Sequence, residues 1–139
     1  MAHVSEETTK GLIADFLKDI IDYPSNQNIK VDGITWFKED SYKGTDYDWL
    51  SVVFEKASKK QSMENKGTPD FMVVKDDSNV IIVIECKSTT SDHSKYSNLV
   101  DYKINGFGSS DDTTKYAIDG ALWYASFLSD RYDVIAIGV

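Results

Sequence analysis

The chain has 139 residues, of which 41% are hydrophobic and 27% are charged, and its formal net charge is −8. This length and balance fit one globular domain with its own core and exclude wholesale disorder. The negative charge argues against a domain that grips nucleic acid unaided, because phosphate contacts need Lys and Arg. The single cysteine excludes an internal disulfide and favours a reducing compartment, so we expect a cytoplasmic protein.

Residues 5–22 are predicted to form an amphipathic helix. Ser5 is a suitable N-cap, and Glu6 and Glu7 favour the helix dipole. The apolar positions recur at helical spacing and predict the buried stripe, which is Leu12, Ile13, Phe16, Leu17, Ile20 and Ile21. Residues 12–21 are too short and too charged for a signal peptide or a membrane span, so we expect no membrane association.

The next segments predict a strand, a helix and a hairpin. Residues 29–37 are expected to form a strand with a turn or bulge at Gly33. A second helix is expected over residues 45–60, opened by Thr45 and Asp48 in a capping-box-like arrangement. Its predicted core stripe is Trp49, Leu50, Val53, Phe54 and Ala57. Strands 70–75 and 80–87 follow, joined by the turn sequence "DDSN".

The last third of the chain predicts a loop, a helix and a strand. Residues 88–112 are polar and irregular, which predicts a long functional loop. Residues 113–130 predict a helix that is apolar nearly all round and packs against a sheet, and residues 132–139 predict a final strand. We expect one α/β domain over residues 1–139, with a mixed central sheet and flanking helices. Because the chain stops within the last strand, we expect it to be the excised N-terminal part of a longer protein.

The register of the hairpin places two carboxylates opposite each other. Counting back from the "DDSN" turn, Phe71 faces Ile84 and Asp70 faces Glu85. Directly opposed side chains have Cβ atoms roughly 4.5–5.5 Å apart, and like charges there are unfavourable. Strand parity puts Lys87 on the same face as Glu85. The sequence therefore predicts two carboxylates and one ammonium at one end of a buried hairpin.

Two close carboxylates either share a proton or bind a cation, and hard oxygen ligands suit Mg²⁺. A nearby lysine can position or activate a water, so the arrangement is suited to metal-assisted attack on a phosphodiester. If the two carboxylates repel each other, Asp70→Asn is expected to melt at or above the wild-type temperature without metal.

These residues also resemble a known family. Pro69-Asp70, a gap and then Glu85-Cys86-Lys87 match the PD-(D/E)xK nuclease motif. The predicted element order resembles the αβββαβ core of that restriction-endonuclease-like superfamily over nearly the whole chain. More narrowly, the segments "GTPDFMVV", "IIVIECK", "YAIDGALWYASFL" and "YDVIAIGV" resemble the N-terminal endonuclease domain fused to N6-adenine DNA methyltransferases in restriction–modification enzymes.

The resemblance implies a role for each motif residue. Asp70 and Glu85 are expected to be catalytic metal ligands, with the backbone carbonyl of Cys86 as a further ligand. Lys87 is expected to be the catalytic lysine. The implied cofactor is Mg²⁺, which Mn²⁺ can replace, and the implied substrate is double-stranded DNA. Other parts of a longer chain are expected to recognise the DNA sequence.

Two helices supply further candidates. The superfamily commonly uses a glutamate on its first helix, and about 100° of rotation per residue favours Glu6 over Glu7 and Asp15. Many relatives carry a glutamine four residues before a tyrosine on the later helix. Tyr124 matches the tyrosine, whereas position 120 is glycine, which puts the role of this helix in doubt.

Other readings of the same residues remain open. A Glu and a Lys at a strand end are often solvated edge charges, and Glu6 also suits a plain helix N-terminus. One alternative function is a stand-alone resolvase or repair nuclease, which predicts a strongly basic face and a dimer. Another is a non-catalytic structural or interaction domain that keeps the hairpin without metal chemistry. The sequence predicts neither the oligomeric state nor the DNA site.

Overall fold

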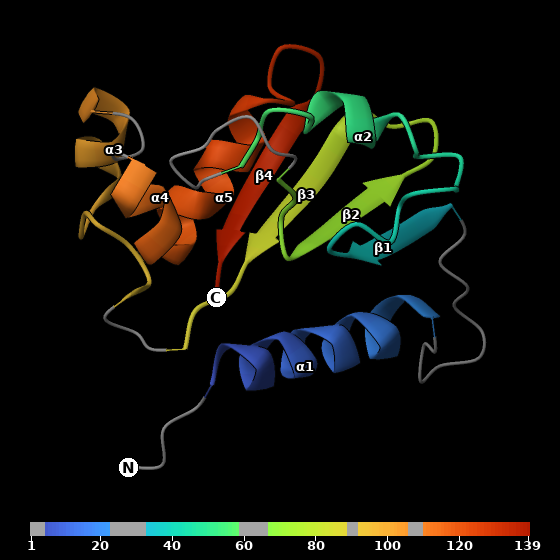
Figure 1. Ribbon diagram of the computed structural model, residues 1–139, viewed down its shortest axis with the longest axis horizontal. Coiled ribbons are helices and arrows are strands. Elements are labelled where there is room, and N and C mark those ends of the chain that lie inside the picture. Colours follow the sequence, from blue (N-terminus) through green and yellow to red (C-terminus); the bar gives the residue numbers. More distant parts are fainter. Residues whose placement is uncertain (1–4, 23–32, 59–66, 89–91, 106–109) are drawn as a thin grey trace.

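A four-stranded mixed sheet forms the centre of the molecule, as the sequence predicted (Figure 1). The computed structural model describes residues 5–22, 33–58, 67–88, 92–105 and 110–139. The strand order follows the chain, and β3 pairs antiparallel with β2 and parallel with β4. The strands are β1 (Ile34–Lys38), β2 (Phe71–Lys75), β3 (Val80–Glu85) and β4 (Asp133–Gly138). The α/β class is therefore confirmed.

The predicted register of the β2–β3 hairpin is confirmed. Phe71 lies opposite Ile84, and the pairing continues to the turn. The strand predicted over 80–87 ends at Glu85, although the Lys87 N–H still donates to the Val139 carbonyl at 2.8 Å. The turn predicted at Gly33 is confirmed by its φ of 77°, and residues 29–32 of the predicted first strand lie outside the described residues.

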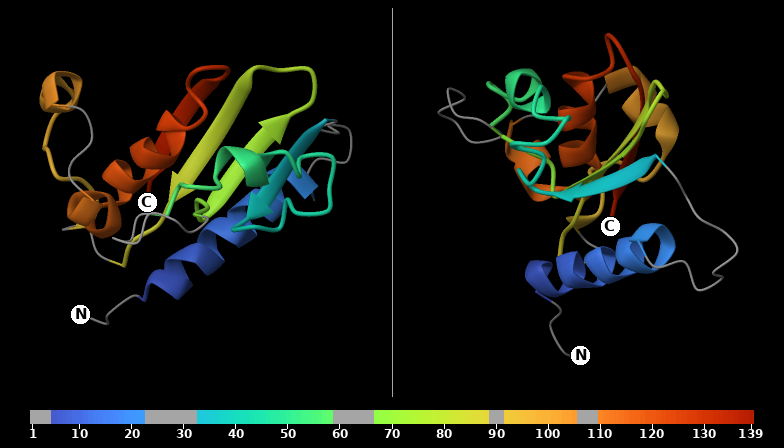
Figure 2. Two further views of the ribbon diagram at one scale, coloured as in Figure 1. Left: turned by 45° about the horizontal axis from the view of Figure 1, so that its top comes forward. Right: turned by 90° about the vertical axis from the view of Figure 1, so that its right-hand side faces the viewer.

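Helices cover both faces of the sheet (Figure 2). α1 (Glu6–Leu17) lies on one face, and α2 (Leu50–Val53) and α5 (Ala117–Ser126) lie on the other. The buried residues of the α1 face are Leu17, Phe71, Ile84 and Cys86. The larger core on the other face consists of Phe37, Tyr42, Leu50, Phe54, Ala57, Met72, Val74, Ile81, Val83, Ala121, Tyr124 and Leu128.

The first helix begins where the sequence predicted. The Ser5 hydroxyl accepts a hydrogen bond from the Thr8 N–H at 3.1 Å, so Ser5 is the N-cap. The helix continues as a π-helical turn over Lys18–Asp22. The apolar stripe is only partly buried, because Leu12 and Phe16 are 62% and 58% exposed. Their predicted core position is wrong, since the helix packs through the neighbouring face.

The second predicted helix is much shorter than expected. Only Leu50–Val53 are α-helical, and residues 59 and 60 lie outside the described residues. Thr45 and Asp48 do not cap it: their side chains accept the Tyr47 and Gly44 N–H groups at 3.1 Å in the preceding turns. Such local side-chain bonds compete with helix formation. The predicted burial of Leu50, Phe54 and Ala57 is confirmed, whereas Trp49 is exposed.

The region predicted as a loop over residues 88–112 contains helical structure. α3 spans Leu99–Asn105, and α4 spans Ser110–Lys115; residues 89–91 and 106–109 lie outside the described residues. The Asn98 side chain accepts the Asp101 N–H at 3.0 Å and so caps the start of α3. The helix predicted over 113–130 is divided at Tyr116, whose backbone is extended.

α5 packs closely against β4, as its small residues predicted. A Cβ at Gly138 would lie 2.8 Å from the Ile118 nitrogen, so only glycine fits there. On the same helix Asp119 is fully buried and accepts the Tyr102 hydroxyl at 2.5 Å and the Lys95 N–H at 3.1 Å. These bonds tie the segment around α3 to α5.

Candidate functional site

The two predicted carboxylates meet at the end of the hairpin opposite its turn. The Asp70 N–H donates to Glu85 Oε1 at 2.9 Å, and the Cys86 N–H donates to Asp70 Oδ2 at 2.8 Å. Asp70 is 9% exposed and Glu85 is 2% exposed. Each acidic side chain therefore bonds to the opposite strand, and together they close the hairpin.

Strand alternation explains why these two acids share a face. Asp70 follows the parity of Met72 and Val74 on β2, and Glu85 follows the parity of Val83 on β3. All three apolar residues belong to the larger core. The polar pair therefore continues a buried apolar row to the point where the sheet ends.

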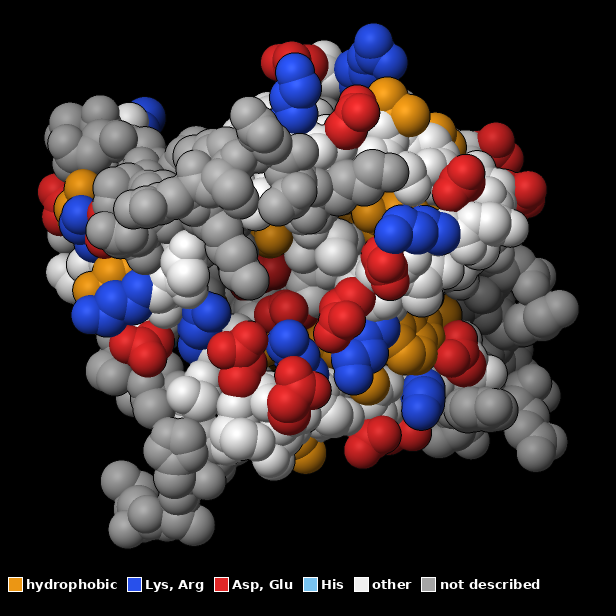
Figure 3. Space-filling view, viewed as in Figure 1, with side chains coloured by type: hydrophobic (Ala, Val, Ile, Leu, Met, Phe, Trp, Pro, Cys, Tyr) orange, Lys and Arg blue, Asp and Glu red, His pale blue; other side chains and the backbone are white. Residues whose placement is uncertain are grey.

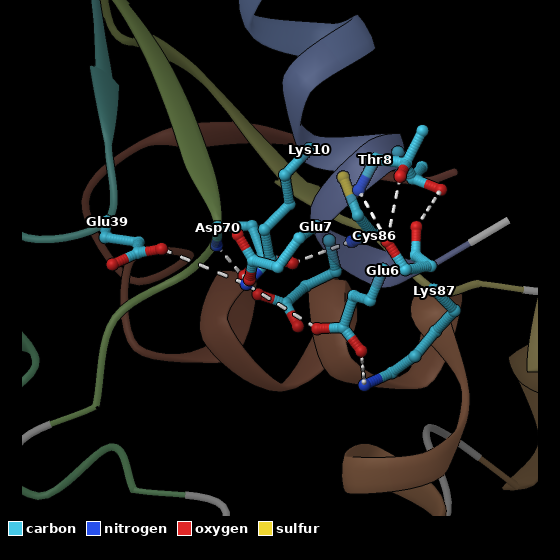
Figure 4. A network of polar contacts seen from close by, with 11 residues as sticks. Glu6, Glu7, Thr8, Lys10, Glu39, Asp70, Cys86 and Lys87 are labelled. Carbon is cyan, nitrogen blue, oxygen red and sulfur yellow. Dashed lines mark hydrogen bonds and ion pairs between the residues drawn. The ribbon is translucent and has the colours of Figure 1, made fainter.

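The first two turns of α1 lie beside this sheet end and add a cation (Figure 4). Lys10 Nζ lies 3.0 Å from Asp70 Oδ1 and 3.6 Å from Glu6 Oε1. The same nitrogen lies 3.5 Å from Glu7 Oε1 and 3.9 Å from Glu39 Oε1. Lys10 is only 9% exposed, so its ammonium occupies the middle of an acidic cluster.

Lys87 and Glu6 lie at the other side of the cluster. Lys87 Nζ is 3.6 Å from Glu6 Oε2, and the side chain of Lys87 is partly buried. Glu6 therefore contacts both lysines, one with each oxygen. Glu7 was expected to point away from the site, but its carboxylate also contacts Lys10. Asp15 is exposed, as predicted.

Glu39 reaches the cluster from the end of β1 through an uncommon backbone conformation. Its φ is 51°, which is the left-handed region that non-glycine residues rarely adopt. Its N–H donates to the Asp70 carbonyl at 2.8 Å, and its carbonyl accepts the Thr68 hydroxyl at 3.1 Å. These two bonds hold the strained residue beside Asp70 and so direct its carboxylate towards Lys10.

The acidic neighbours hold Lys10 in its charged form. Burial alone would lower the pKa of Lys10, but the hydrogen bond and the charge of Asp70 outweigh it, with smaller contributions from Glu6 and Glu7. The pKa of Lys10 is therefore raised well above its usual range. Lys10 is therefore an ammonium near neutral pH.

Cys86 contributes its backbone N–H to the site and not its sulfur. Its side chain is fully buried, and burial, followed by the charges of Asp70 and Glu85, raises the pKa of the thiol to about 12. A thiol with that pKa is neither a nucleophile nor a soft metal ligand near neutral pH. The Cys86 N–H contacts Asp70, and the expected metal-binding role of the Cys86 carbonyl stays a prediction.

Tyr124 approaches the carboxylate pair from α5, within the larger core. It is buried, and its ring packs edge-on against Phe54 at 5.8 Å between centroids. Burial, followed by the charges of Glu85 and Asp70, raises its pKa. Its hydroxyl therefore stays protonated near the site. Gly120, one turn earlier, is buried and offers no side chain in place of the expected glutamine.

The donor set fits a hard divalent cation in its chemistry. Among the described residues, the network contains five carboxylates against two ammonium groups, which leaves it negative: Glu6, Glu7, Glu39, Asp70 and Glu85 against Lys10 and Lys87. Carboxylate oxygens are the ligands that Mg²⁺ prefers. Within the described part of the chain, however, no group of three or more His, Cys, Asp or Glu side chains is arranged to hold one metal ion.

Lys10 and Glu39 are the site residues that sequence reasoning missed. Lys10 lies seven residues before Leu17 and four before Ala14, so it shares their side of α1. A charged residue on the packing face at one end of a helix is the signal that could have found it. No comparable sequence pattern marks Glu39, because the position of this residue depends on the turn after β1.

Comparison with models of protein families finds no match, and comparisons with curated proteins and with solved structures find none either. Across the described residues, no helix has the length and apolar character needed to cross a membrane. On the face shown in Figure 3, acidic and basic side chains are mixed where α1 meets the sheet. The interpretation of the site therefore depends on its own geometry and on the sequence motif.

Proposed function

We propose that this chain is a Mg²⁺-dependent DNA endonuclease domain of the PD-(D/E)xK superfamily, and that it is the cleavage module of a restriction–modification enzyme. The observation that carries the proposal is the Asp70–Glu85 pair, which is bonded across the hairpin end beside Lys87. Buried acids at a sheet end with a lysine two positions beyond the strand are unusual for purely structural residues.

In this proposal Asp70 and Glu85 hold the cation, together with the carbonyl of Cys86. When bound there, a divalent cation would supply a Lewis acid for the phosphoryl oxygen and would lower the pKa of a bound water. Mn²⁺ fits the same oxygen donors. The hydrogen bonds from the Asp70 and Cys86 N–H groups fix the orientation of both carboxylates before any cation arrives.

Lys87 acts on the attacking water and on the charge of the phosphate. Its ammonium lies 3.6 Å from Glu6 Oε2, and Glu6 also contacts Lys10, the partner of Asp70. Hydrolysis joins the water oxygen to phosphorus and breaks one phosphorus–oxygen ester bond, whose oxygen leaves with a proton. A positioned ammonium donates hydrogen bonds to the water and stabilises the negative charge that develops on the phosphoryl oxygens.

The substrate is double-stranded DNA, and other parts of a longer chain supply its sequence recognition. The net charge of −8 supports this division, because the domain alone repels a polyanion. The single, buried cysteine supports a reducing compartment, for which we propose the cytoplasm.

The substitution Lys87→Ala in the full-length protein tests the proposal. We expect the rate of plasmid cleavage in MgCl2 to fall by about 10²- to 10⁴-fold, while circular dichroism and DNA binding stay unchanged. Lys75→Ala, at the turn end of β2, is the matched control and should cleave normally, because Lys75 is exposed and remote from the carboxylate pair. Normal cleavage by Lys87→Ala would remove Lys87 from the mechanism.

A second candidate is a non-catalytic structural or interaction domain. The contact of Lys10 with Asp70 favours it, because a lysine already balances the buried acid without a metal ion. Isothermal titration with MgCl2 and MnCl2 separates the two candidates. Binding that Asp70→Asn abolishes supports the nuclease, and the absence of binding supports the non-catalytic domain.

A further inference from the structure

The position of Lys10 has a consequence for metal binding that rests on the proposed function. Asp70 has two carboxylate oxygens, and each has a partner. Oδ2 accepts the Cys86 N–H at 2.8 Å and so joins the two strands of the hairpin. Oδ1 accepts the ammonium of Lys10 at 3.0 Å. A cation that binds Asp70 through Oδ1 therefore competes with Lys10 for that oxygen.

The two cations exclude each other at that oxygen. Mg²⁺ binds oxygen at about 2.0–2.1 Å and demands a nearly complete octahedral shell. An ammonium 3.0 Å from the same oxygen would lie close to that shell and would repel the ion. The ammonium is also shielded from water, because Lys10 is almost fully buried. Its charge is therefore poorly screened at the place where a metal would enter.

We propose that Lys10 is an internal counter-cation that competes with the divalent metal for Asp70. Without metal, it balances the acidic cluster and fixes the first turn of α1 against the sheet end. Metal binding displaces the ammonium from Asp70, and the exposed carboxylate of Glu7, three residues earlier on the same helix, offers it another partner. Lys10 thus lowers the affinity for metal and couples metal binding to the contact between α1 and the sheet.

Titration of the 139-residue chain with MgCl2 and MnCl2 tests this competition. Lys10→Met keeps a flexible apolar stem and removes the charge, and we expect its metal affinity to rise about tenfold or more. Its melting temperature without metal should fall, because the acidic cluster loses its central cation, and the metal-induced gain should exceed that of the wild type. Lys10→Arg keeps the charge and should keep the weak affinity.

The matched control is Lys43→Met, which makes the same change in net charge. Lys43 pairs with Asp40 at 2.8 Å on the exposed surface and takes part in none of the ion pairs of Lys10, so its loss should leave metal affinity unchanged. If wild type and Lys10→Met bind metal with equal affinity, the proposed role of Lys10 is wrong, whereas the proposed metal site is unaffected. Absence of binding in wild type, Lys10→Met and Lys10→Arg overturns the proposed metal site itself.

A measurement on the wild-type chain covers the case in which Lys10→Met fails to fold. The side-chain NMR signal of Lys10, assigned by its loss in Lys10→Arg, should shift during titration with MgCl2. The midpoint of the shift should equal that of calorimetric binding. If the Lys10 signal does not shift while the metal saturates the protein, metal binding does not displace Lys10 from Asp70, and the proposal is wrong.

Discussion

The two ends of the β2–β3 hairpin carry acidic residues in very different surroundings. At the turn end Asp76 and Asp77 are exposed, Asp77 has a φ of 58°, and Asp76 accepts the hydroxyl of Tyr47. At the other end Asp70 and Glu85 are buried and bonded across the strands. The same residue types therefore serve turn geometry at one end and form an acidic site at the other.

The difference lies in the neighbours rather than in the acids. At the turn end Asp76 contacts Tyr47 and the Gly33 carbonyl, and the exposed side chains of Asp76 and Asp77 are open to water. The other end lies beside the first two turns of α1, which supply Lys10 and Glu6. Burial makes a carboxylate costly unless cations and N–H groups stabilise it, so such a group stays charged only where these partners are provided.

The largest effect on stability is expected for Glu85→Ala. This change leaves the buried Asp70 N–H without its acceptor, which costs about 1–3 kcal/mol in the free energy of unfolding. Glu85→Gln keeps an acceptor oxygen and should cost less. At the other end Asp77→Asn should change stability by less than about 0.5 kcal/mol, because Asn also tolerates a positive φ. Urea unfolding of the three variants checks this order.

If Glu85→Ala and Asp77→Asn lost the same free energy of unfolding, the acids at both ends of the hairpin would serve only the local chain geometry. Equal losses for Glu85→Ala and Glu85→Gln would instead show that the charge of Glu85, and not its role as acceptor, stabilises the hairpin.

A smaller effect is expected from Cys86 at alkaline pH. The pKa of its thiol is about 12 in the folded chain and about 9 in the unfolded chain, so the unfolded state loses its proton first. Its contribution to stability is therefore complete below pH 9 and is lost as the pH rises towards 12. From pH 8 to pH 10 the stability of wild type relative to Cys86→Ala should fall by about 1 kcal/mol. A constant difference in urea unfolding across this range would contradict the burial of the thiol.

Much of the fold could be predicted because it depends on short-range patterns. The turn "DDSN" and strand parity determine the pairing of Phe71 with Ile84, and this pairing is present. The small, apolar residues of α5 predicted its burial against the sheet. The short α3 was missed because its cap at Asn98 lies in a polar stretch without apolar periodicity. The predicted start of α2 at residue 45 was wrong because local side-chain bonds in the preceding turns replaced helical ones.

The candidate site divides in the same way. Parity within one hairpin brought Asp70 and Glu85 together, and the helical wheel selected Glu6, whose carboxylate lies within the network. Lys10 and Glu39 depend on how α1 and the end of β1 pack against the sheet, which no single segment encodes. Their absence from the prediction matters, because Lys10 is a cation in contact with Asp70 that the sequence reasoning did not include.

This cation also changes the expectation for Asp70→Asn without metal. Repulsion between two carboxylates predicted that the variant would melt at or above the wild-type temperature. Because Asp70 pairs with Lys10 at 3.0 Å, removing its charge leaves a buried ammonium without its nearest partner. The structure therefore predicts that Asp70→Asn melts below the wild type in the absence of metal.

The most direct test of the paired-carboxylate site is a melting series in MgCl2 and MnCl2 for wild type, Asp70→Asn and Asp77→Asn. At ten times the dissociation constant, a cation that binds only the folded chain adds about 1.4 kcal/mol, or roughly 4 °C in Tm. We expect this gain in wild type and in Asp77→Asn, which alters the opposite end of the hairpin, and its loss in Asp70→Asn. A full metal response in Asp70→Asn would contradict the site.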